Sequence, residues 1–159
     1  MRINLLYTEE EPRSGYLNVS PFATEETDEL KIGDPTFKLS AWVDDAEATE
    51  IVANDVIDYL PADIVMDVLS HWVAKLRHGG TLIIGGTDLY EVCKGFTTYA
   101  IDVHQANAHL HGHAADNPQF VKKITLTALG LSNFLATMGL TIIKKRVTGY
   151  HFIVEAKRP

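Results

Sequence analysis

Four histidines stand close together in the segment DVHQANAHLHGHAADNP, residues 102–118. If this segment is extended, His109, His111 and His113 lie on one side of it, because alternate residues of an extended chain point the same way. Imidazole is a common ligand of zinc, nickel and copper, and Asp116 would add an oxygen ligand. No cysteine or glutamate nearby completes a tetrahedral set, so the pattern favours a polar surface loop over a metal centre.

A second group of polar residues lies at or just after stretches that are apolar enough to be buried strands. The polar residues are Asn18, Asn54, Asp55 and Asp88. Tyr7 lies near them and offers a ring on which a ligand could stack. The carboxyl ends of parallel strands meet at one rim of a sheet, so these side chains would face one ligand site. The alternative is structural: Asn54 and Asp55 would cap the turn after them, and Asp88 would cap the next helix.

The clearest part of the sequence is a strand, helix and strand unit in the middle of the chain. Ile51–Ile57 is apolar and rich in β-branched residues, which predicts a buried strand. Apolar residues recur at helical spacing over residues 64–76, and Gly79 and Gly80 are the predicted stop of this helix. Thr81–Ile84 has no polar alternation, as expected for a second strand of a parallel sheet, and the unit should form a right-handed crossover.

The N-terminal third is predicted to hold strands joined by loops. Arg2–Tyr7 and Tyr16–Phe22 are short apolar runs bounded by turn residues. The acidic stretch that follows contains Gly33 and Pro35, and we expect it to be a loop with one short strand near Phe37–Trp42.

The C-terminal third is predicted to be a helix followed by a hairpin. A helical stripe of apolar residues over residues 124–138 ends at Gly139, and the strands Thr141–Val147 and Tyr150–Lys157 flank a turn. The whole pattern predicts an α/β fold: a three-layer, doubly wound, mostly parallel sheet with a C-terminal antiparallel hairpin. At 159 residues, one domain over 1–159 is expected.

Several of these segments resemble motifs of the class I S-adenosylmethionine-dependent methyltransferases, in particular the methyltransferase type 11 group. The quoted segments, in chain order, are SGYLNVSPF (Ser14–Phe22), ANDVIDYLP (Ala53–Pro61), KLRHGGTLII (Lys75–Ile84), TDL (Thr87–Leu89) and the helix ending Gly139-Leu140. Within the second segment, Asp58 and Tyr59 stand where the family has a glutamate and a histidine. The resemblance covers most of the chain and implies a methyltransferase-like Rossmann architecture.

The resemblance also implies where the cofactor would lie, and there the sequence departs from the family. The family has a glycine-rich turn after its first strand, because only glycine lets the backbone approach the cofactor closely; residues 5–8 are Leu-Leu-Tyr-Thr. At the end of the second strand the family presents an acid to both ribose hydroxyls, and Ser20 stands there. Losing such a charge-assisted pair costs about 1.5–3 kcal/mol, or roughly ten- to hundredfold in affinity.

By this resemblance, the residues that would contact S-adenosylmethionine are Tyr7, Asn18, Ser20, Asn54, Asp55 and Asp88. In the family, the segment that corresponds to the histidine stretch lies over the substrate side of the pocket. His109 and His111 would there act on a substrate proton near neutral pH. The sequence identifies no catalytic residue.

Composition narrows the classes of partner. The chain has a net charge of -7, with net -11 over residues 1–63 and net +4 over residues 64–159. An acidic protein repels phosphate backbones, so nucleic-acid binding is disfavoured, while attraction between the two halves would allow a homo-oligomer. No apolar run is long enough for a membrane helix, and the single cysteine, Cys93, fits a buried thiol in a reducing compartment. We expect a cytoplasmic, soluble protein whose partner is a small molecule or another protein.

Two main hypotheses follow from the sequence. In the first, a methyltransferase-fold protein has weak or lost S-adenosylmethionine binding and serves as a non-catalytic binding or structural subunit. In the second, it is an active methyltransferase of a small-molecule or glycan-like substrate. A third, metal binding by the histidine segment, is less favoured.

Overall fold

A computed structural model describes residues 1–8, 10–115 and 117–159, and Asp116 therefore lies outside the described residues. The elements are β1 (Arg2–Leu5), β2 (Leu17–Ser20), β3 (Leu30–Ile32), β4 (Ala48–Ala53), η1 (Ile57–Tyr59), α1 (Val65–Lys75), β5 (Leu76–Thr87), α2 (Leu89–Thr97), α3 (Val103–His111), η2 (Pro118–Phe120), α4 (Ala128–Thr137), β6 (Thr141–Thr148) and β7 (His151–Lys157).

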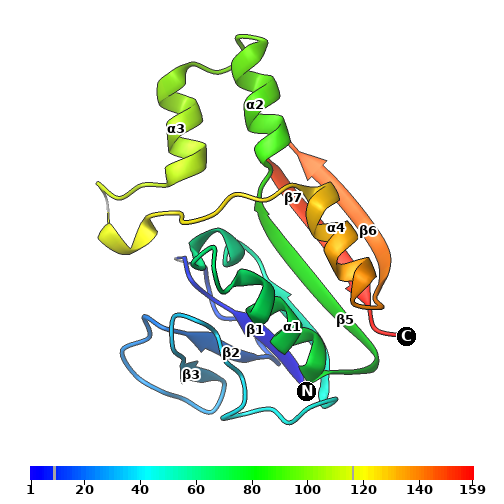
Figure 1. The fold of residues 1–159 in the computed structure, drawn as a ribbon. Coiled ribbons are helices and arrows are strands. Elements are labelled where there is room, and N and C mark those ends of the chain that lie inside the picture. Colours follow the sequence, from blue (N-terminus) through cyan, green and yellow to red (C-terminus); the bar gives the residue numbers. More distant parts are fainter. Residues whose placement is uncertain (9, 116) are drawn as a thin grey trace.

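The strands form one mixed sheet in the order β3-β2-β1-β4-β5-β7-β6 (Figure 1). Strands β1 to β5 pair in parallel, and β7 pairs antiparallel with both β5 and β6. The chain winds outward in both directions from the junction of β1 and β4. The predicted doubly wound sheet with a closing antiparallel hairpin is thus confirmed.

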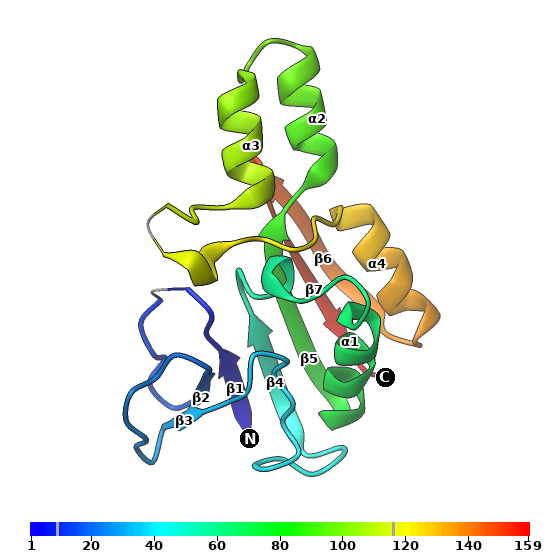
Figure 2. The ribbon, with the colours of Figure 1, turned by 60° about the vertical axis from the view of Figure 1, so that its left-hand side comes forward.

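Helices α1 and α4 lie side by side on one face of the sheet (Figure 2). The core between them and the sheet contains Trp72, Leu69, Leu135, Leu82 and Phe152, all fully buried. Burial of such large apolar side chains is the main stabilising contribution of this layer.

Residues 33–47 pack beside α1 on the same face, and the strand predicted near Phe37–Trp42 was wrong. The Trp72 indole donates a hydrogen bond to the Phe37 carbonyl at 3.1 Å, and the Leu39 amide donates one to His71 at 2.9 Å. Phe37, Leu39 and Val43 are buried in the core. Their apolar pattern therefore reflects packing against a helix instead of a place in the sheet.

The end of α1 also differs from the prediction. The helix ends at Lys75, and β5 begins at once with Leu76, so Gly79 and Gly80 lie inside a strand. The pairing of β4 with β5 shifts register at this point. A Cβ on Gly80 would lie 2.9 Å from the Ala48 carbonyl oxygen, so the second glycine serves the close approach of two strands.

Helices α2 and α3 form an arm that projects beyond the carboxyl end of β5 (Figures 1 and 2). The arm was not predicted as two helices, although Asp88 was expected to cap a helix. Cys93 lies exposed on α2, so the expectation of a buried thiol was wrong. Among the described residues, no helix is both long enough and apolar enough to cross a membrane.

Candidate functional site

An aromatic stack closes the carboxyl end of β1. The Tyr7 ring lies parallel to the Tyr59 ring at 4.3 Å between centroids, and it meets the Phe22 ring edge-on at 4.9 Å. Its hydroxyl donates a hydrogen bond to the Gln119 carbonyl at 2.8 Å. Tyr7 and Tyr59 are only 6% and 7% exposed. The ring that was predicted to stack on a ligand stacks on protein side chains.

Burial changes the acidity of this stack. Desolvation, with help from the carboxylates of Asp55 and Asp58, raises the pKa of Tyr59 to about 12. Desolvation also raises the pKa of Tyr7. Both phenols therefore stay protonated at neutral pH and act only as hydrogen-bond donors or acceptors.

Asn18 fastens the β1–β2 loop onto the sheet. Its Oδ1 accepts hydrogen bonds from the Asn4 side chain at 2.9 Å and from the Arg13 amide at 2.8 Å. Its amide donates to the carbonyls of Arg13 and Glu29 at 3.0 and 3.1 Å. Asn18 is fully buried, so its polar atoms are committed to holding the loop.

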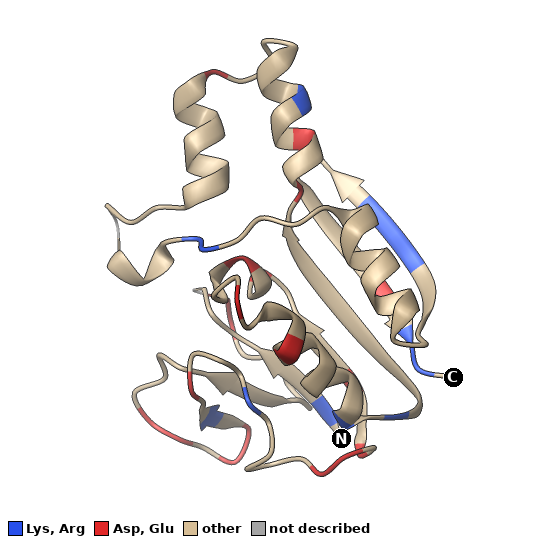
Figure 3. Cartoon of the chain, in the orientation of Figure 1, with Lys and Arg blue, Asp and Glu red and all other residues tan. Residues whose placement is uncertain are grey.

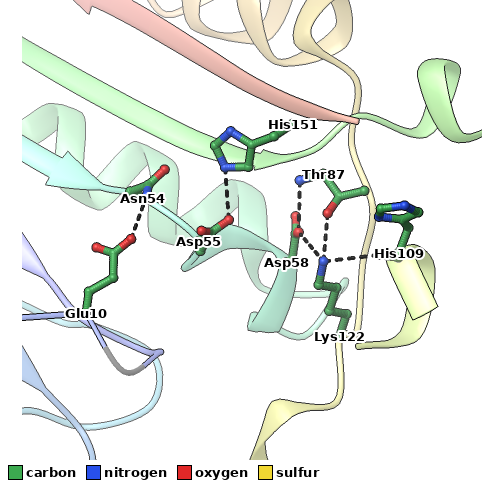
Figure 4. Close-up of polar contacts among 8 residues, drawn as sticks. All are labelled: Glu10, Asn54, Asp55, Asp58, Thr87, His109, Lys122 and His151. Carbon is green, nitrogen blue, oxygen red and sulfur yellow. Dashed lines mark hydrogen bonds and ion pairs between the residues drawn. The ribbon is translucent and has the colours of Figure 1, made fainter. Parts of the chain in front are cut away.

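The next two predicted residues also contact the chain itself. The Ser20 hydroxyl accepts a hydrogen bond from the Phe22 amide at 3.2 Å, as in a local turn. The Asn54 amide donates to Glu10 of the β1–β2 loop at 2.6 Å (Figure 4). Asn54 fits there because Gly85 has no side chain: a Cβ on that residue would lie 2.1 Å from Asn54 Oδ1. This approach ties the loop to the ends of β4 and β5.

Asp55 and His151 form an ion pair on the rim of the sheet. The distance from His151 Nε2 to Asp55 Oδ1 is 3.0 Å, and both side chains are 36% exposed. Asp55 has φ of +50°, a conformation that aspartate tolerates better than most residues and that turns its carboxylate toward β7. The hydrogen bond that the His151 ring donates to the Asp55 carboxylate raises the pKa of His151. The pair is therefore partly accessible to solvent at the rim.

A second, buried cluster lies beside this pair (Figure 4). Asp58 is 1% exposed, and its Oδ2 accepts a hydrogen bond from the Thr87 amide at 3.0 Å and lies 3.5 Å from Lys122 Nζ. Lys122 also donates to the Thr87 hydroxyl at 2.7 Å and to the His109 carbonyl at 3.1 Å. Burial raises the pKa of Asp58, against the influence of Thr87 and Lys122. The cluster joins η1, β5, α3 and the segment before α4.

The segment around Lys122 is also held by backbone bonds. The amides of Lys123 and Ile124 both donate to the Asp58 carbonyl, at 2.7 and 3.2 Å. Residues 117–127, which lead into α4, pass over the carboxyl ends of β4 and β5. Asp58 thus fixes this segment through both its side chain and its backbone.

Asp88 caps α2 and also binds the first amide of α4, whose own N-cap is Thr127. One carboxylate oxygen accepts from the Glu91 amide of α2 at 3.0 Å, and the other accepts from the Ala128 amide of α4 at 2.9 Å. The structural alternative for Asp88, a helix cap, is therefore present, and both oxygens are used. Its carboxylate is almost fully buried.

The histidine segment is helical, so the premise of an extended metal-binding strand was wrong. His109 and His111 lie in α3, two residues apart and hence on different sides of the helix, and His113 follows the helix. The His109 ring packs against Tyr150 at 4.6 Å, and burial lowers its pKa. Among the described residues, no group of three or more histidine, cysteine or acidic side chains is placed to hold a metal ion. His111 and His113 instead line a surface pocket of about 430 Å³ with His104.

The structure therefore divides the predicted residues among separate tasks. Tyr7, Asn18 and Asn54 hold the β1–β2 loop, Asp55 lies on the rim, and Asp88 organises the helices. Sequence reasoning missed His151 and Lys122, which come from distant segments. The only local signal for them was their place next to predicted element ends, which many surface residues share.

The chain resembles known proteins in its three-dimensional fold and not in its sequence. No family model matches the sequence, and no curated protein matches it. Among solved structures, an S-adenosylmethionine-dependent methyltransferase from Archaeoglobus fulgidus aligns with a TM-score of 0.59 and 12% identity over 99% of this chain and 86% of that one. The Burkholderia thailandensis 1,6-didemethyltoxoflavin-N1-methyltransferase, solved with S-adenosylhomocysteine, aligns with a TM-score of 0.57 and 12% identity over 98% and 70%.

Larger methyltransferases align over part of their length. An O-methyltransferase family protein from Burkholderia thailandensis aligns with a TM-score of 0.53 and 14% identity over 82% of this chain, which spans only 35% of that protein. At these identities the likeness concerns the arrangement of strands and helices. The chain has a class I S-adenosylmethionine-dependent methyltransferase-like fold.

Proposed function

We propose that this chain is a non-catalytic member of the methyltransferase fold, with weak or lost S-adenosylmethionine binding, that acts as a binding or structural subunit. The observation that carries the proposal is the stack of Tyr7 on Tyr59 at 4.3 Å, at the end of β1, where the fold otherwise presents its cofactor turn. Two buried phenol rings occupy the region in which a backbone turn would have to meet the ligand.

The residues nearest that position do not fit the cofactor. No glycine stands in residues 5–8, and Asn18 uses its side chain to hold the loop. Ser20 offers one hydroxyl where a carboxylate would bind both ribose hydroxyls. Asn54 is turned toward Glu10. These contacts would have to break before S-adenosylmethionine could bind in the usual position.

Calorimetric titration with S-adenosylmethionine and S-adenosylhomocysteine tests the proposal. We expect no heat of binding up to about 1 mM ligand, which corresponds to a binding free energy weaker than roughly -4 kcal/mol. An active methyltransferase titrated with the same solutions is the control for ligand quality. Micromolar binding that Asp55→Ala abolishes would overturn the proposal.

One observation favours the alternative, an active methyltransferase of a small-molecule or glycan-like substrate. The Asp55–His151 pair is partly exposed on the rim and could accept a proton from a substrate. If the titration gives binding, methyl transfer that falls in His151→Gln with cofactor affinity unchanged would support this alternative.

The partner in the proposed role is another protein or a small molecule. Among solved complexes of this fold, one joins the Haloferax volcanii Trm112 methyltransferase activator to a putative methyltransferase, and it aligns with this chain with a TM-score of 0.57 and 12% identity over 89% of this chain and 71% of that one. We propose a cytoplasmic location, where a single exposed cysteine stays reduced.

A further inference from the structure

Strand β6 forms one edge of the sheet, and it is unusually exposed. Every residue from Thr141 to Thr148 is exposed except Ile142, which is half-buried. Its inner side pairs with β7, and among the described residues no strand lies on its outer side. An edge strand has unpaired backbone amides and carbonyls, which can pair with another extended chain.

An apolar groove runs beside this edge. It has a volume of about 350 Å³ and lies between β6 and the beginnings of α2 and α4. Its apolar residues are well exposed: Tyr90 is 65% exposed, Leu129 59% and Val147 40%. Side chains of a strand added to β6 would therefore find an apolar site on this face.

The edge is strongly basic. Lys144, Lys145 and Arg146 are consecutive and exposed, and within the described residues none of them forms an ion pair. Lys145 pairs in register with buried Val154 and so lies on the groove side, whereas Lys144 and Arg146 lie on the other face. Figure 3 shows the three cations as one continuous blue segment of β6, with Glu155 opposite Lys144 on β7 and Glu91 at the wall of the groove as the nearby acids.

The three positive charges favour one of three possible binding partners for this edge: a second copy of the chain, a nucleic acid or a peptide. Two copies of β6 side by side would bring six cations together, which disfavours self-pairing. A nucleic acid has no peptide backbone that could add to the sheet as a strand, and the net charge of -7 repels it. An extended peptide with acidic residues satisfies the backbone, the charges and the groove together.

We infer that β6 is the docking strand for an acidic, extended segment of a partner protein, which adds to the sheet and places an apolar side chain in the groove of Tyr90, Leu129 and Val147. This inference names the partner surface of the binding subunit and rests on that proposed function. Backbone pairing supplies affinity, and the three cations and the groove supply selectivity.

The probe is a peptide selected from a displayed library of random 12-residue peptides. The library is sorted for binding to the full chain. We expect enrichment of acidic sequences with β-branched residues. The best synthetic peptide should bind at least about tenfold more weakly to the variant Lys144→Glu/Lys145→Glu/Arg146→Glu. The variant Lys31→Glu/Lys38→Glu/Arg77→Glu changes the net charge equally at surface positions away from β6, and it should bind normally.

Two further measurements separate strand addition from simple charge attraction. N-methylation of alternate peptide residues should abolish binding for one set of positions and spare the other, because only alternate amides face β6. Leu129→Glu should weaken peptide binding several-fold, because it places a negative charge in the apolar groove. Circular dichroism checks that each variant keeps its fold.

Several results would overturn the inference. These are the absence of enrichment, equal binding to both triple variants, or equal loss from both sets of N-methylated peptides. A single-stranded oligodeoxythymidine that competes for the same edge would assign it to nucleic acid. A wild-type dimer that the β6 variant splits would assign it to a second copy. The titration with S-adenosylmethionine tests the proposed function separately. The docking strand and the loss of cofactor binding can therefore be disproved independently.

Discussion

The sheet has two halves that differ in how their strands are connected. One half contains β1, β2 and β3, and the other, here called the helix-wound half, contains β5, β6 and β7. Strands β1 to β3 contain only 4, 4 and 3 residues, and no α-helix connects them within residues 1–8 and 10–47. Strands β5, β6 and β7 contain 12, 8 and 7 residues, and helices α1 to α4 connect this half. Most of the acidic residues also lie in the first half. The helix-wound half therefore has the longer strands and contains most of the residues of the sheet.

This difference bears on ligand binding. In doubly wound folds, the helix after the first strand points its amino-terminal amides at the ligand. Here a loop follows β1, and its bonds go to Asn18 and Asn54. The helices α1 to α4 all lie in the half that contains β5, β6 and β7. The proposed loss of cofactor binding would therefore arise in the half without helices, whereas the overall fold depends mainly on the other half.

The largest effect should come from the aromatic stack that joins the two halves. Tyr7→Ala removes a buried ring from between β1 and η1 and should lower the free energy of unfolding by about 4 kcal/mol, by the lost contacts and the cavity left behind. Denaturant unfolding measures it. Tyr99, 95% exposed at the tip of the arm, is the matched control, and Tyr99→Ala should change little. Equal effects of the two variants would mean that the stack does not hold the halves together.

The second prediction concerns the buried pair in the helix-wound half. Asp58→Ala leaves Lys122 buried without its carboxylate and should cost about 3 kcal/mol, less than a fully unpaired charge would, because Lys122 keeps two other acceptors. The double variant Asp58→Ala/Lys122→Met should recover part of the loss. Asp63→Ala, at an exposed acid, serves as control. No recovery in the double variant would contradict an interaction between the two charges.

The third prediction tests how the loop in the first half is held. Asn18→Ala removes five hydrogen bonds, to Asn4, Arg13, Tyr16 and Glu29, and leaves buried polar groups unpaired, which should cost about 2 kcal/mol. Hydrogen exchange should show faster opening of β1 and β2, with β5 and β7 unchanged. Asn133→Ala, at an exposed position of α4, controls for the loss of an amide. Uniform loss of protection in all strands would show that the halves unfold as one unit.

The smallest effect concerns pH. Asp55 raises the pKa of His151 above its ordinary value of 6.5, so the pair stabilises the fold fully below pH 6.5 and less as the pH rises through the raised pKa. Asp55→Asn should remove this pH dependence. Nuclear magnetic resonance titration of the His151 ring measures the pKa directly. His71 and His109, whose pKa values are lowered by burial, should titrate identically in both proteins. An unchanged pKa of His151 in Asp55→Asn would exclude the pair.

Much of the helix-wound half could be predicted from the sequence. The apolar period over residues 64–76 and the closing hairpin directly report which side chains are buried. Helix α3 was missed because it has no buried residue and therefore no apolar stripe. Its capping box was visible, since Asp102 and Gln105 have the right spacing and bond to each other's backbone amides.

The candidate site could be predicted only in part. The rim residues Asn54 and Asp55 follow from strand ends, which is local information. Their partners Glu10 and His151 are 44 and 96 residues away, and tertiary packing alone brings them together. Tyr7 was identified as a stacking ring, but its stacking partner depends on how the loop and η1 fold over the rim. Such long-range pairing leaves no periodic signal in a single sequence.

The bonding of Asp88 to both helices has a mechanical consequence. Helices α2 and α4 both begin on the two oxygens of one buried carboxylate, directly after β5 ends. A tilt of the arm at its base would stretch a hydrogen bond to the carboxylate that also binds the first amide of α4. Asp88 therefore couples the base of the arm to the start of the helix that covers the sheet, since both bind one carboxylate.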